Sequence, residues 1–344
     1  MFSLFAKKVS TTATINGLKI RVEPKETVLK AALREGIDFP HNCRVGGCAA
    51  CKCKLVSGDV KELTDTSYLL SQEELDQGFI LACQSVPKND IRVEVDLNWR
   101  LARRRIKGRI VGQEKLTHSI TRLVVQLDER LPYKAGQFAE LRLDCLPDTP
   151  RNYSFATSVQ LDAKVSFYVR HVPGGFFSSI IWNHHLRDQG IQVEGPIGDL
   201  YLRKAEAPLL LIAGGSGLAP IIALLQEALA NGVSRSTTLL FGAREECDLY
   251  ALDEIKLIAS QWSGEFRFVP VLSSAPENAT WQGARGWVTD KIPELLESGA
   301  HAYLCGPPAM VDSAVDLLRR QGVAHQHIHA DRFITQLGQL AVSA

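Results

Sequence analysis

Four cysteines in the N-terminal part of the chain have the spacing of ligands to a metal cluster. Cys43, Cys48 and Cys51 form the pattern C-x4-C-x2-C, and Cys83 follows after a separate segment. Soft thiolate sulfur suits iron, and a loop lets closely spaced cysteines converge on one pair of metal ions. The spacing is typical of a [2Fe–2S] cluster, which holds one electron at a time.

Other thiol sites compete with this interpretation. A zinc knuckle uses paired C-x2-C units, and only Cys48 and Cys51 fit that pattern. A dithiol redox site needs just two cysteines. Cys53, Cys145 and Cys247 stand outside the spacing, so we expect them to be small buried or incidental thiols.

Length and composition indicate a globular protein of several domains. The chain of 344 residues is longer than an ordinary domain with a single hydrophobic core. Lys and Arg total 39 against 38 for Asp and Glu, so we expect neither nucleic acid nor an anionic membrane as a partner. The start, MFSLFAKKV, lacks a secretory signal, so a cytoplasmic location is expected. The uncharged stretch 207–225 contains GGSG and Pro220, which favour a strand, a loop and a helix start over a membrane span.

The elements around the cysteines predict a first domain over residues 1–97. TATINGLKIRVE predicts two strands joined at Asn16, and TVLKAALREG predicts an amphipathic helix. CRVGGCAAC with LACQ downstream resembles the ferredoxin domain of the plant-type family, which implies a β-grasp fold. Residues 98–105 are predicted to be a linker, and the arginines of NWRLARRRIKGRI are either solvated or a docking patch for an acidic partner.

Residues 106–204 contain short apolar runs separated by turns, which predict a small antiparallel β-barrel. Within it lie RNYS, at 151–154, and VRHVPGGFFS, at 169–178. An Arg beside a Tyr offers a cation for phosphate and a ring for stacking, and amides at a helix start can hold a pyrophosphate. A turn and a core tyrosine are the structural alternative.

In this order the two motifs resemble the FAD-binding barrel of the ferredoxin–NADP reductase superfamily. The resemblance implies that Arg151 binds the pyrophosphate, Tyr153 packs against the isoalloxazine and Ser154 lies near flavin N5. The flavin's nucleotide portion would contact Arg170 and His171, and its phosphates would lie along Gly175, Phe176, Phe177 and Ser178. His184 and His185 match no motif, and we expect them on the surface.

Residues 205–344 alternate strands and helices, which predicts a doubly wound, Rossmann-like parallel sheet. GGSG follows a strand and opens a helix, where amides can cradle phosphate, although it is not the G-x-G-x-x-G fingerprint. AYLCGPPAMV, at 302–311, is a second strand that ends in Gly and Pro before a helix. Strand ends at one edge of such a sheet build a ligand crevice. A plain turn and an inert buried thiol are the alternatives.

Both motifs resemble the pyridine-nucleotide domain of the same superfamily. The cofactor's phosphates and ribose would contact Gly214, Gly215, Ser216, Gly217 and Pro220, and the nicotinamide would lie by Cys305, Gly306, Pro307 and Met310. The resemblance implies that Cys305 stands beside the hydride path. Arg244, in FGAR at the next strand end, suits a 2′-phosphate or an adenine ring, and relatives with this motif favour NADH.

The tail HIHADRFITQLG resembles the end of the naphthalene and terephthalate dioxygenase reductases. The resemblance implies that Asp331 and Phe333 approach the flavin; the alternative is a charged and an apolar residue that finish a sheet. His325, His327 and His329 alternate at strand spacing, but no carboxylate or cysteine joins them in sequence, so a metal site is not expected there.

The motifs, in the order iron–sulfur, flavin and nicotinamide, resemble the reductase component of multicomponent aromatic-ring (Rieske) oxygenases. The resemblance implies that electrons pass from NADH, or from NADPH, to FAD, to a [2Fe–2S] cluster, and then to an oxygenase component or an intermediary ferredoxin. Reductases of diiron monooxygenases and of a deoxysugar dehydratase system share this architecture. A redox sensor is the non-enzymatic alternative. We expect a monomer.

Overall fold

The computed structural model describes residues 10–41, 44–46, 49–67, 69–70, 72–95, 103–275 and 280–333. These residues divide into two compact units, one made of the described residues up to 95 and one of those from 103 to 333. None of the helices that they form has both the length and the apolar character needed to cross a membrane.

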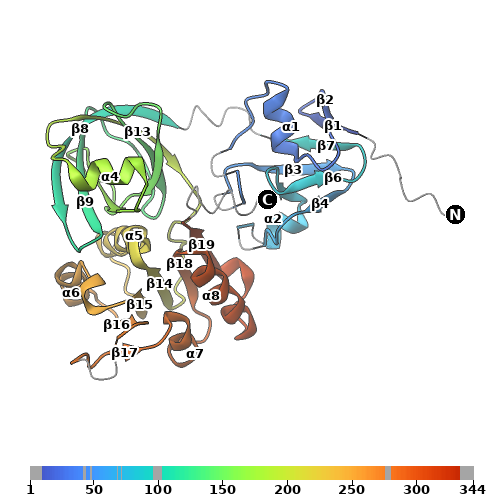
Figure 1. Ribbon diagram of the computed structural model, residues 1–344. Coiled ribbons are helices and arrows are strands. Elements are labelled where there is room, and N and C mark those ends of the chain that lie inside the picture. The colour runs from blue at the N-terminus through green and yellow to red at the C-terminus, as the bar shows by residue number, and fades with distance from the viewer. Residues whose placement is uncertain are drawn as a thin grey trace. The chain divides into compact units, whose positions relative to one another are not determined.

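The first unit is a mixed β-sheet that packs against a helix, which is the predicted β-grasp fold (Figure 1). Its elements are β1 (Thr11–Ile15), β2 (Leu18–Val22), α1 (Val28–Arg34), β3 (Lys52–Ser57), β4 (Val60–Glu62), α2 (Gln72–Asp76), β5 (Phe79–Leu81), β6 (Ser85–Pro87) and β7 (Ile91–Glu94). The main sheet has the order β2-β1-β7-β3-β5, and β4 pairs with β6.

Local sequence signals explain how this unit begins. Asn16 and Gly17 both have positive φ, at 47° and 90°, which is the geometry of the two-residue turn that Asn-Gly favours between antiparallel strands. Thr27 caps α1, because its hydroxyl accepts a hydrogen bond from the Lys30 amide. The apolar face of α1 then closes the core of the unit over the sheet.

The second unit begins with the predicted antiparallel barrel. Its elements are β8 (Arg104–Lys115), β9 (Ile120–Leu127), β10 (Phe138–Leu143), β11 (Arg151–Ser154), β12 (Lys164–Arg170), α4 (Phe176–Asn183) and β13 (Gly190–Ile197). The strand order is β11-β10-β13-β8-β9-β12, and a bridge between Phe155 and Phe167 joins the two edges. Alternate residues of β13 are buried, so this strand presents one face to the barrel core, whereas β12 is buried on both faces.

The second unit continues as a parallel sheet of order β17-β16-β15-β14-β18-β19. Its elements are β14 (Leu209–Gly214), the 3₁₀ turn η1 (Gly215–Gly217), α5 (Leu218–Ala230), β15 (Thr237–Ala243), η2 (Glu246–Asp248), α6 (Leu252–Gln261), β16 (Phe266–Leu272), β17 (Ala284–Arg285), η3 (Val288–Lys291), α7 (Ile292–Leu295), β18 (His301–Gly306), α8 (Pro308–Arg320), η4 (His325–His327) and β19 (Ile328–Arg332).

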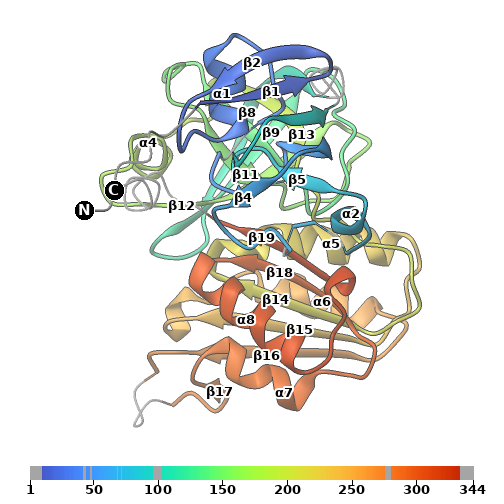
Figure 2. The ribbon, with the colours of Figure 1, turned by 90° about the vertical axis from the view of Figure 1, so that its right-hand side faces the viewer.

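Helices cover both faces of this sheet. Figure 2 shows α7 and α8 on the near face and α5 and α6 behind it. The core on the α5 side also contains barrel residues, among them Ile120 and Tyr168. Barrel and parallel sheet are therefore joined by one continuous apolar core, which explains why they form one compact unit.

The strand order fixes where a ligand can enter the parallel sheet. β14 lies between β15 and β18, so successive strands are added first on one side of β14 and later on the other. In open α/β sheets, the crevice at such a reversal binds the ligand at the carboxyl ends of the strands. GGSG ends β14 and CGPP ends β18, so both predicted motifs lie at this reversal.

Candidate active site

Strand pairing brings two of the four predicted cluster ligands together. Cys51 directly precedes β3 and Cys83 follows β5, and these strands pair antiparallel with Lys52 opposite Leu81. Both cysteines are buried, and the Cys83 amide donates a hydrogen bond to Cys51 Sγ at 3.4 Å. Cys43 and Cys48, the other two predicted ligands, lie outside the described residues.

The described part of the cysteine loop fits a cluster held close to backbone. Gly46 is buried with φ of +78°, and a Cβ at this position would lie 2.8 Å from the Gln84 side chain. Arg44 and Ala49 also have positive φ, so the loop turns tightly without relying on glycine alone. Buried sulfur donors beside such a loop are the chemistry that an iron–sulfur cluster requires.

The thiols outside the spacing have different surroundings. Cys53 is buried on β3, and burial, with a smaller contribution from Cys83, raises its pKa to about 12. It is therefore a protonated core side chain at neutral pH. Cys145 and Cys247 are exposed.

The first predicted flavin motif lies on the short strand β11. Tyr153 stacks on Phe177, with ring centroids 5.6 Å apart. Burial raises the pKa of the Tyr153 phenol, so the ring stays neutral. Ser154 is buried, and Arg151 donates to the Pro150 carbonyl at 2.7 Å. β11 thus brings the predicted arginine, tyrosine and serine to one edge of the barrel.

The second flavin motif forms the turn that enters α4. Gly175 is the N-cap, and Ser178 Oγ accepts a hydrogen bond from the Val172 amide at 3.1 Å, which holds the turn closed. Phe177 is buried in the barrel core, whereas Phe176 is 74% exposed. The two phenylalanines predicted to lie along the phosphates therefore occupy different environments.

His171 has a neighbour that the sequence did not indicate. Its ring stacks on Trp182 with an interplanar angle of 8°, and Lys115 Nζ lies 4.0 Å from the centroid of the same indole. Arg170 is exposed at the end of β12. His184 and His185 are exposed, and α4 ends directly before them.

Close backbone contact explains the glycines of GGSG. A Cβ on Gly217 would lie 2.5 Å from the Cys305 carbonyl carbon, and one on Gly214 would lie 2.5 Å from Met310 Sδ. Gly306 has φ of +159°, and a Cβ there would lie 3.1 Å from the Gly214 amide nitrogen. The glycines therefore let the turn after β14 and the end of β18 approach each other.

Four predicted residues lie together at the ends of β18 and β19. Cys305 is opposite Asp331, and the Phe333 amide donates to the Gly306 carbonyl at 2.9 Å. Complete burial raises the pKa of the Cys305 thiol well above its usual range, and Asp331 raises it further. Cys305 is therefore an uncharged thiol at this edge of the sheet.

The other predicted nucleotide residues lie nearby. Pro220 is buried in the first turn of α5, Ser216 lies within η1, and Pro307 is the N-cap of α8. Arg244 is exposed directly after β15.

Residues of the barrel and of the parallel sheet meet at the first turn of GGSG. A Cβ on Gly215 would lie 3.6 Å from Arg170 Nη1. The Tyr250 hydroxyl donates to the Gly215 carbonyl at 2.9 Å, and the Tyr250 ring meets that of Tyr168, on β12, edge to face. Tyr168 in turn donates to Glu254 on α6 at 3.2 Å. Sequence reasoning missed both tyrosines, because each looks like an ordinary core residue.

The C-terminal histidines pack as aromatic rings. His327 stacks on His301 with centroids 4.1 Å apart, and His329 stacks on Tyr303 at 4.7 Å. Burial, followed by the effect of Arg203, lowers the pKa of His329 to about 3. Among the residues that the structure describes, no group of three or more His, Cys, Asp or Glu side chains is arranged to hold a metal ion.

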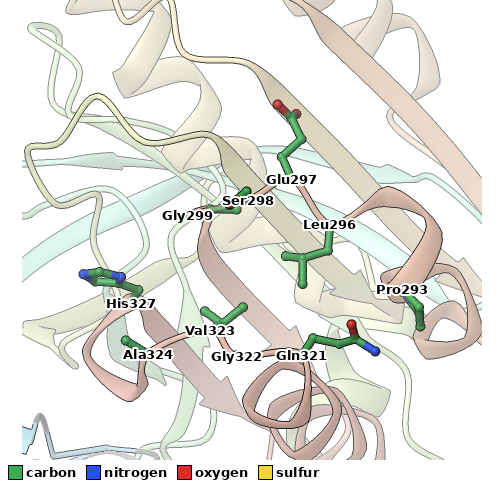
Figure 3. A pocket seen from close by; sticks show the side chains of 11 residues that line it. Pro293, Leu296, Glu297, Ser298, Gly299, Gln321, Gly322, Val323, Ala324 and His327 are labelled. Atoms are coloured by element: carbon green, nitrogen blue, oxygen red, sulfur yellow. The ribbon is translucent and has the colours of Figure 1, made fainter.

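A pocket of about 370 Å³ lies at the amino ends of the strands of the parallel sheet, away from the predicted nucleotide site (Figure 3). Its walls are the segments that lead into β18 and β19, including Leu296, Glu297, Val323 and His327. These residues precede the amino ends of the strands, whereas the predicted nucleotide site lies at the carboxyl ends. The pocket is therefore separate from the candidate active site.

Three family profiles match the chain in sequence. They are described as a 2Fe-2S iron-sulfur cluster binding domain over residues 13–88, an oxidoreductase FAD-binding domain over 107–201 and an oxidoreductase NAD-binding domain over 211–316. They confirm the fold of each part and the three predicted cofactors.

Curated and solved relatives match over nearly the whole length. The chain is 38% identical to the xylene/toluene monooxygenase electron transfer component XylA of Pseudomonas putida, covering 96% of this chain and 95% of that one. It is 34% identical to the reductase component of the naphthalene 1,2-dioxygenase system of Pseudomonas putida, covering 89% and 93%. The crystal structure of the Amycolatopsis cytochrome P450 reductase GcoB superposes with a TM-score of 0.68 at 33% identity, covering 94% and 98%.

Proposed function

Because this chain belongs to the family of iron–sulfur flavoprotein reductases that serve as electron-transfer components of oxygenase systems, we propose that it supplies electrons to an oxygenase acting on an aromatic compound. When bound, FAD would supply the exchange between the two-electron chemistry of NADH and the one-electron chemistry of a [2Fe–2S] cluster, which the predicted ligands Cys51 and Cys83 would help to hold. The chain's own residues bind these groups, orient them and exclude water.

The observation that carries the proposal is the meeting of the barrel with the first turn of the parallel sheet. Arg170 ends β12 beside Gly215, and Tyr250 fixes the Gly215 carbonyl by its hydrogen bond. The flavin residues on β11 and the nucleotide residues at the ends of β14 and β18 thus belong to one compact unit. A nicotinamide held at this crevice would have its position set by a core in which the barrel residues Ile120 and Tyr168 also pack.

Cys305 contributes to this site as a neutral side chain. Its thiol is fully buried with a raised pKa, so it neither titrates nor acts as a base near neutral pH. We propose that it supports the nicotinamide by packing, next to Asp331 and Phe333.

The charges around Arg244 support NADH over NADPH. Glu245 and Glu246 follow it directly, and all three residues are exposed where the chain passes from the end of β15 into η2. A 2′-phosphate at this strand end would meet one cation and two carboxylates, whereas a 2′-hydroxyl can donate to a carboxylate. We therefore propose that the 2′-hydroxyl of NADH binds here.

A cysteine substitution separates the two halves of the proposed path. The variant Cys51→Ser removes a buried predicted ligand, and Cys145→Ser, at an exposed cysteine, is the matched control. We expect Cys51→Ser to keep NADH-dependent reduction of ferricyanide, which can take electrons from FAD, and to lose roughly 100-fold in reduction of an oxygenase partner. Wild-type oxygenase turnover by Cys51→Ser would refute the path through the cluster.

The partner is the finer part of the proposal. A Rieske-type dioxygenase is the first candidate, since a naphthalene dioxygenase reductase is 34% identical over 89% of the chain. A monooxygenase is the second candidate, supported by 38% identity with a xylene/toluene monooxygenase component. Reconstitution with one purified oxygenase of each class would discriminate them, by the amount of hydroxylated product formed per NADH. If no hydroxylated product formed with either class of oxygenase, the proposed role would be refuted.

A further inference from the structure

Gln84, the residue after the cluster cysteine Cys83, is buried with its side chain directed at that cysteine. Its Nε2 donates a hydrogen bond to Cys83 Sγ at 3.6 Å, and the residue as a whole is 6% exposed. The Gln84 backbone is fixed on both sides, because its amide donates to the Leu81 carbonyl at 2.8 Å and its carbonyl accepts from the Leu63 amide at 2.8 Å.

Two neighbours fix the Gln84 side chain itself. The Thr64 hydroxyl donates to Gln84 Oε1 at 3.1 Å. Gly46, in the cysteine loop, covers the amide so closely that a Cβ there would lie 2.8 Å from Gln84 Cγ and 3.3 Å from Nε2. The carboxamide is therefore held between Gly46 of the cysteine loop and Thr64.

The chemistry of the groups determines which way the carboxamide points. A cysteine thiolate that binds iron can only accept a hydrogen bond, whereas a threonine hydroxyl can donate or accept. The NH₂ group of Gln84 therefore faces Cys83, and its oxygen faces Thr64. The opposite orientation would place an oxygen lone pair against sulfur.

A hydrogen bond to a ligand sulfur affects the two oxidation states of a cluster unequally. The reduced cluster carries one more negative charge, so a donor stabilises it more than the oxidised cluster and raises the reduction potential. We propose that Gln84 sets the potential of the cluster by donating to Cys83 Sγ, and that Thr64 acts as a positioning residue for the Gln84 carboxamide. This inference rests on the proposed function, because it requires a cluster bound at Cys83.

The direct test is an EPR-monitored redox titration of the full chain. Gln84→Leu keeps a side chain of similar size and removes the donor. We expect the equilibrium constant for cluster reduction to fall roughly tenfold, which is a shift of about −59 mV for one electron. Thr64→Val should shift the potential in the same direction by less, and Thr64→Ser, which keeps the hydroxyl, should match the wild type.

A double variant distinguishes a relay from two separate effects. Because Thr64 acts through Gln84, Gln84→Leu/Thr64→Val should have the same potential as Gln84→Leu alone. Additive shifts, or a wild-type potential in Gln84→Leu, would overturn the inference. If Gln84→Leu does not retain iron, the reduction potential of Thr64→Val alone tests the inference, because this variant leaves the cysteines and Gln84 in place. An unchanged potential in Thr64→Val would overturn the proposed action of Thr64 through Gln84.

Iron content and the FAD reaction separate this inference from the proposed function. Every variant should keep the wild-type iron content per chain and the wild-type rate of FAD reduction by NADH, because Thr64 and Gln84 both lie in the first unit. Wild-type protein without iron would refute the proposed function itself. Iron present with an unaffected potential would refute only the role of Gln84.

Discussion

The substitution Gly217→Ala tests the close approach between the two nucleotide motifs. A Cβ at this position would lie 2.5 Å from the Cys305 carbonyl carbon and 2.8 Å from the Gly306 amide nitrogen. Ordinary contact begins near 3.4 Å, so the turn after β14 and the end of β18 must separate by about 1 Å. Neither partner can move cheaply, because β18 is paired on both sides and α5 begins directly after the turn.

The expected effect is large on the nucleotide reaction and small elsewhere. A displacement of about 1 Å in a substrate-positioning element can cost roughly 100-fold, so we expect kcat/KM for NADH to fall by about that factor. Overpacking should also destabilise the second unit by about 1–3 kcal/mol. Content of iron and FAD should be unchanged, because the substitution lies outside the residues predicted to hold them.

Gly232→Ala is the matched control for this prediction. Gly232 lies just beyond α5, and a Cβ there meets nothing within 4 Å. Its φ of +68° makes alanine cost about 1–2 kcal/mol in backbone strain, but without a clash at the crevice. Stopped-flow reduction of FAD by NADH should distinguish the two variants. A Gly217→Ala enzyme with wild-type kcat/KM would refute the assignment of this turn to the nucleotide site.

Three further predictions concern other parts of the chain. Phe177→Ala should lower the free energy of unfolding by about 3–5 kcal/mol and should lower FAD content without lowering iron content, because Phe177 is buried and stacks on Tyr153. Full FAD content in this variant would contradict the prediction. Iodoacetamide should label exposed Cys145 in native protein but leave Cys305 unlabelled in peptide mass spectra, and equal labelling would contradict the burial. Burial lowers the pKa of His301 to about 4, and that of His329 lies near 3, both from 6.5. The folded protein favours the neutral form of both histidines, so their contribution to stability is complete above pH 6.5 and is lost as the pH falls toward 4. Replacing both with Asn should therefore flatten the fall in melting temperature between pH 7 and 5. An unchanged slope would contradict this prediction.

Features set by short stretches of sequence were predictable. The Asn-Gly pair specifies a turn by backbone preference alone, and the structure has positive φ at both Asn16 and Gly17. GGSG and CGPP follow apolar β-runs, and both end strands that are neighbours in the sheet. The cysteine spacing likewise pointed to a common site, and Cys51 and Cys83 are adjacent.

Features set by pairing across long stretches were not predictable. The Tyr250 contact with Gly215 spans 35 residues, and the Thr64 contact with Gln84 depends on how β4 and β6 align. Tyr250 lies in the loop between η2 and α6, and Thr64 lies just after β4, so neither residue carries a local sign of its distant partner. The continuity between barrel and parallel sheet has the same origin, because Ile120 and Tyr168 look like ordinary barrel core residues and instead pack against α5 and its sheet.

The central claim is that this chain takes hydride from NADH and releases single electrons through its cluster. An anaerobic titration with NADH, followed by flavin absorbance and by EPR, tests it most directly. We predict protein that contains FAD and two iron atoms per chain, whose flavin bleaches on NADH addition while the signal of a one-electron-reduced [2Fe–2S] cluster appears. Flavin that bleaches while iron-loaded protein stays EPR-silent, or purified protein that lacks iron or flavin, would contradict the claim.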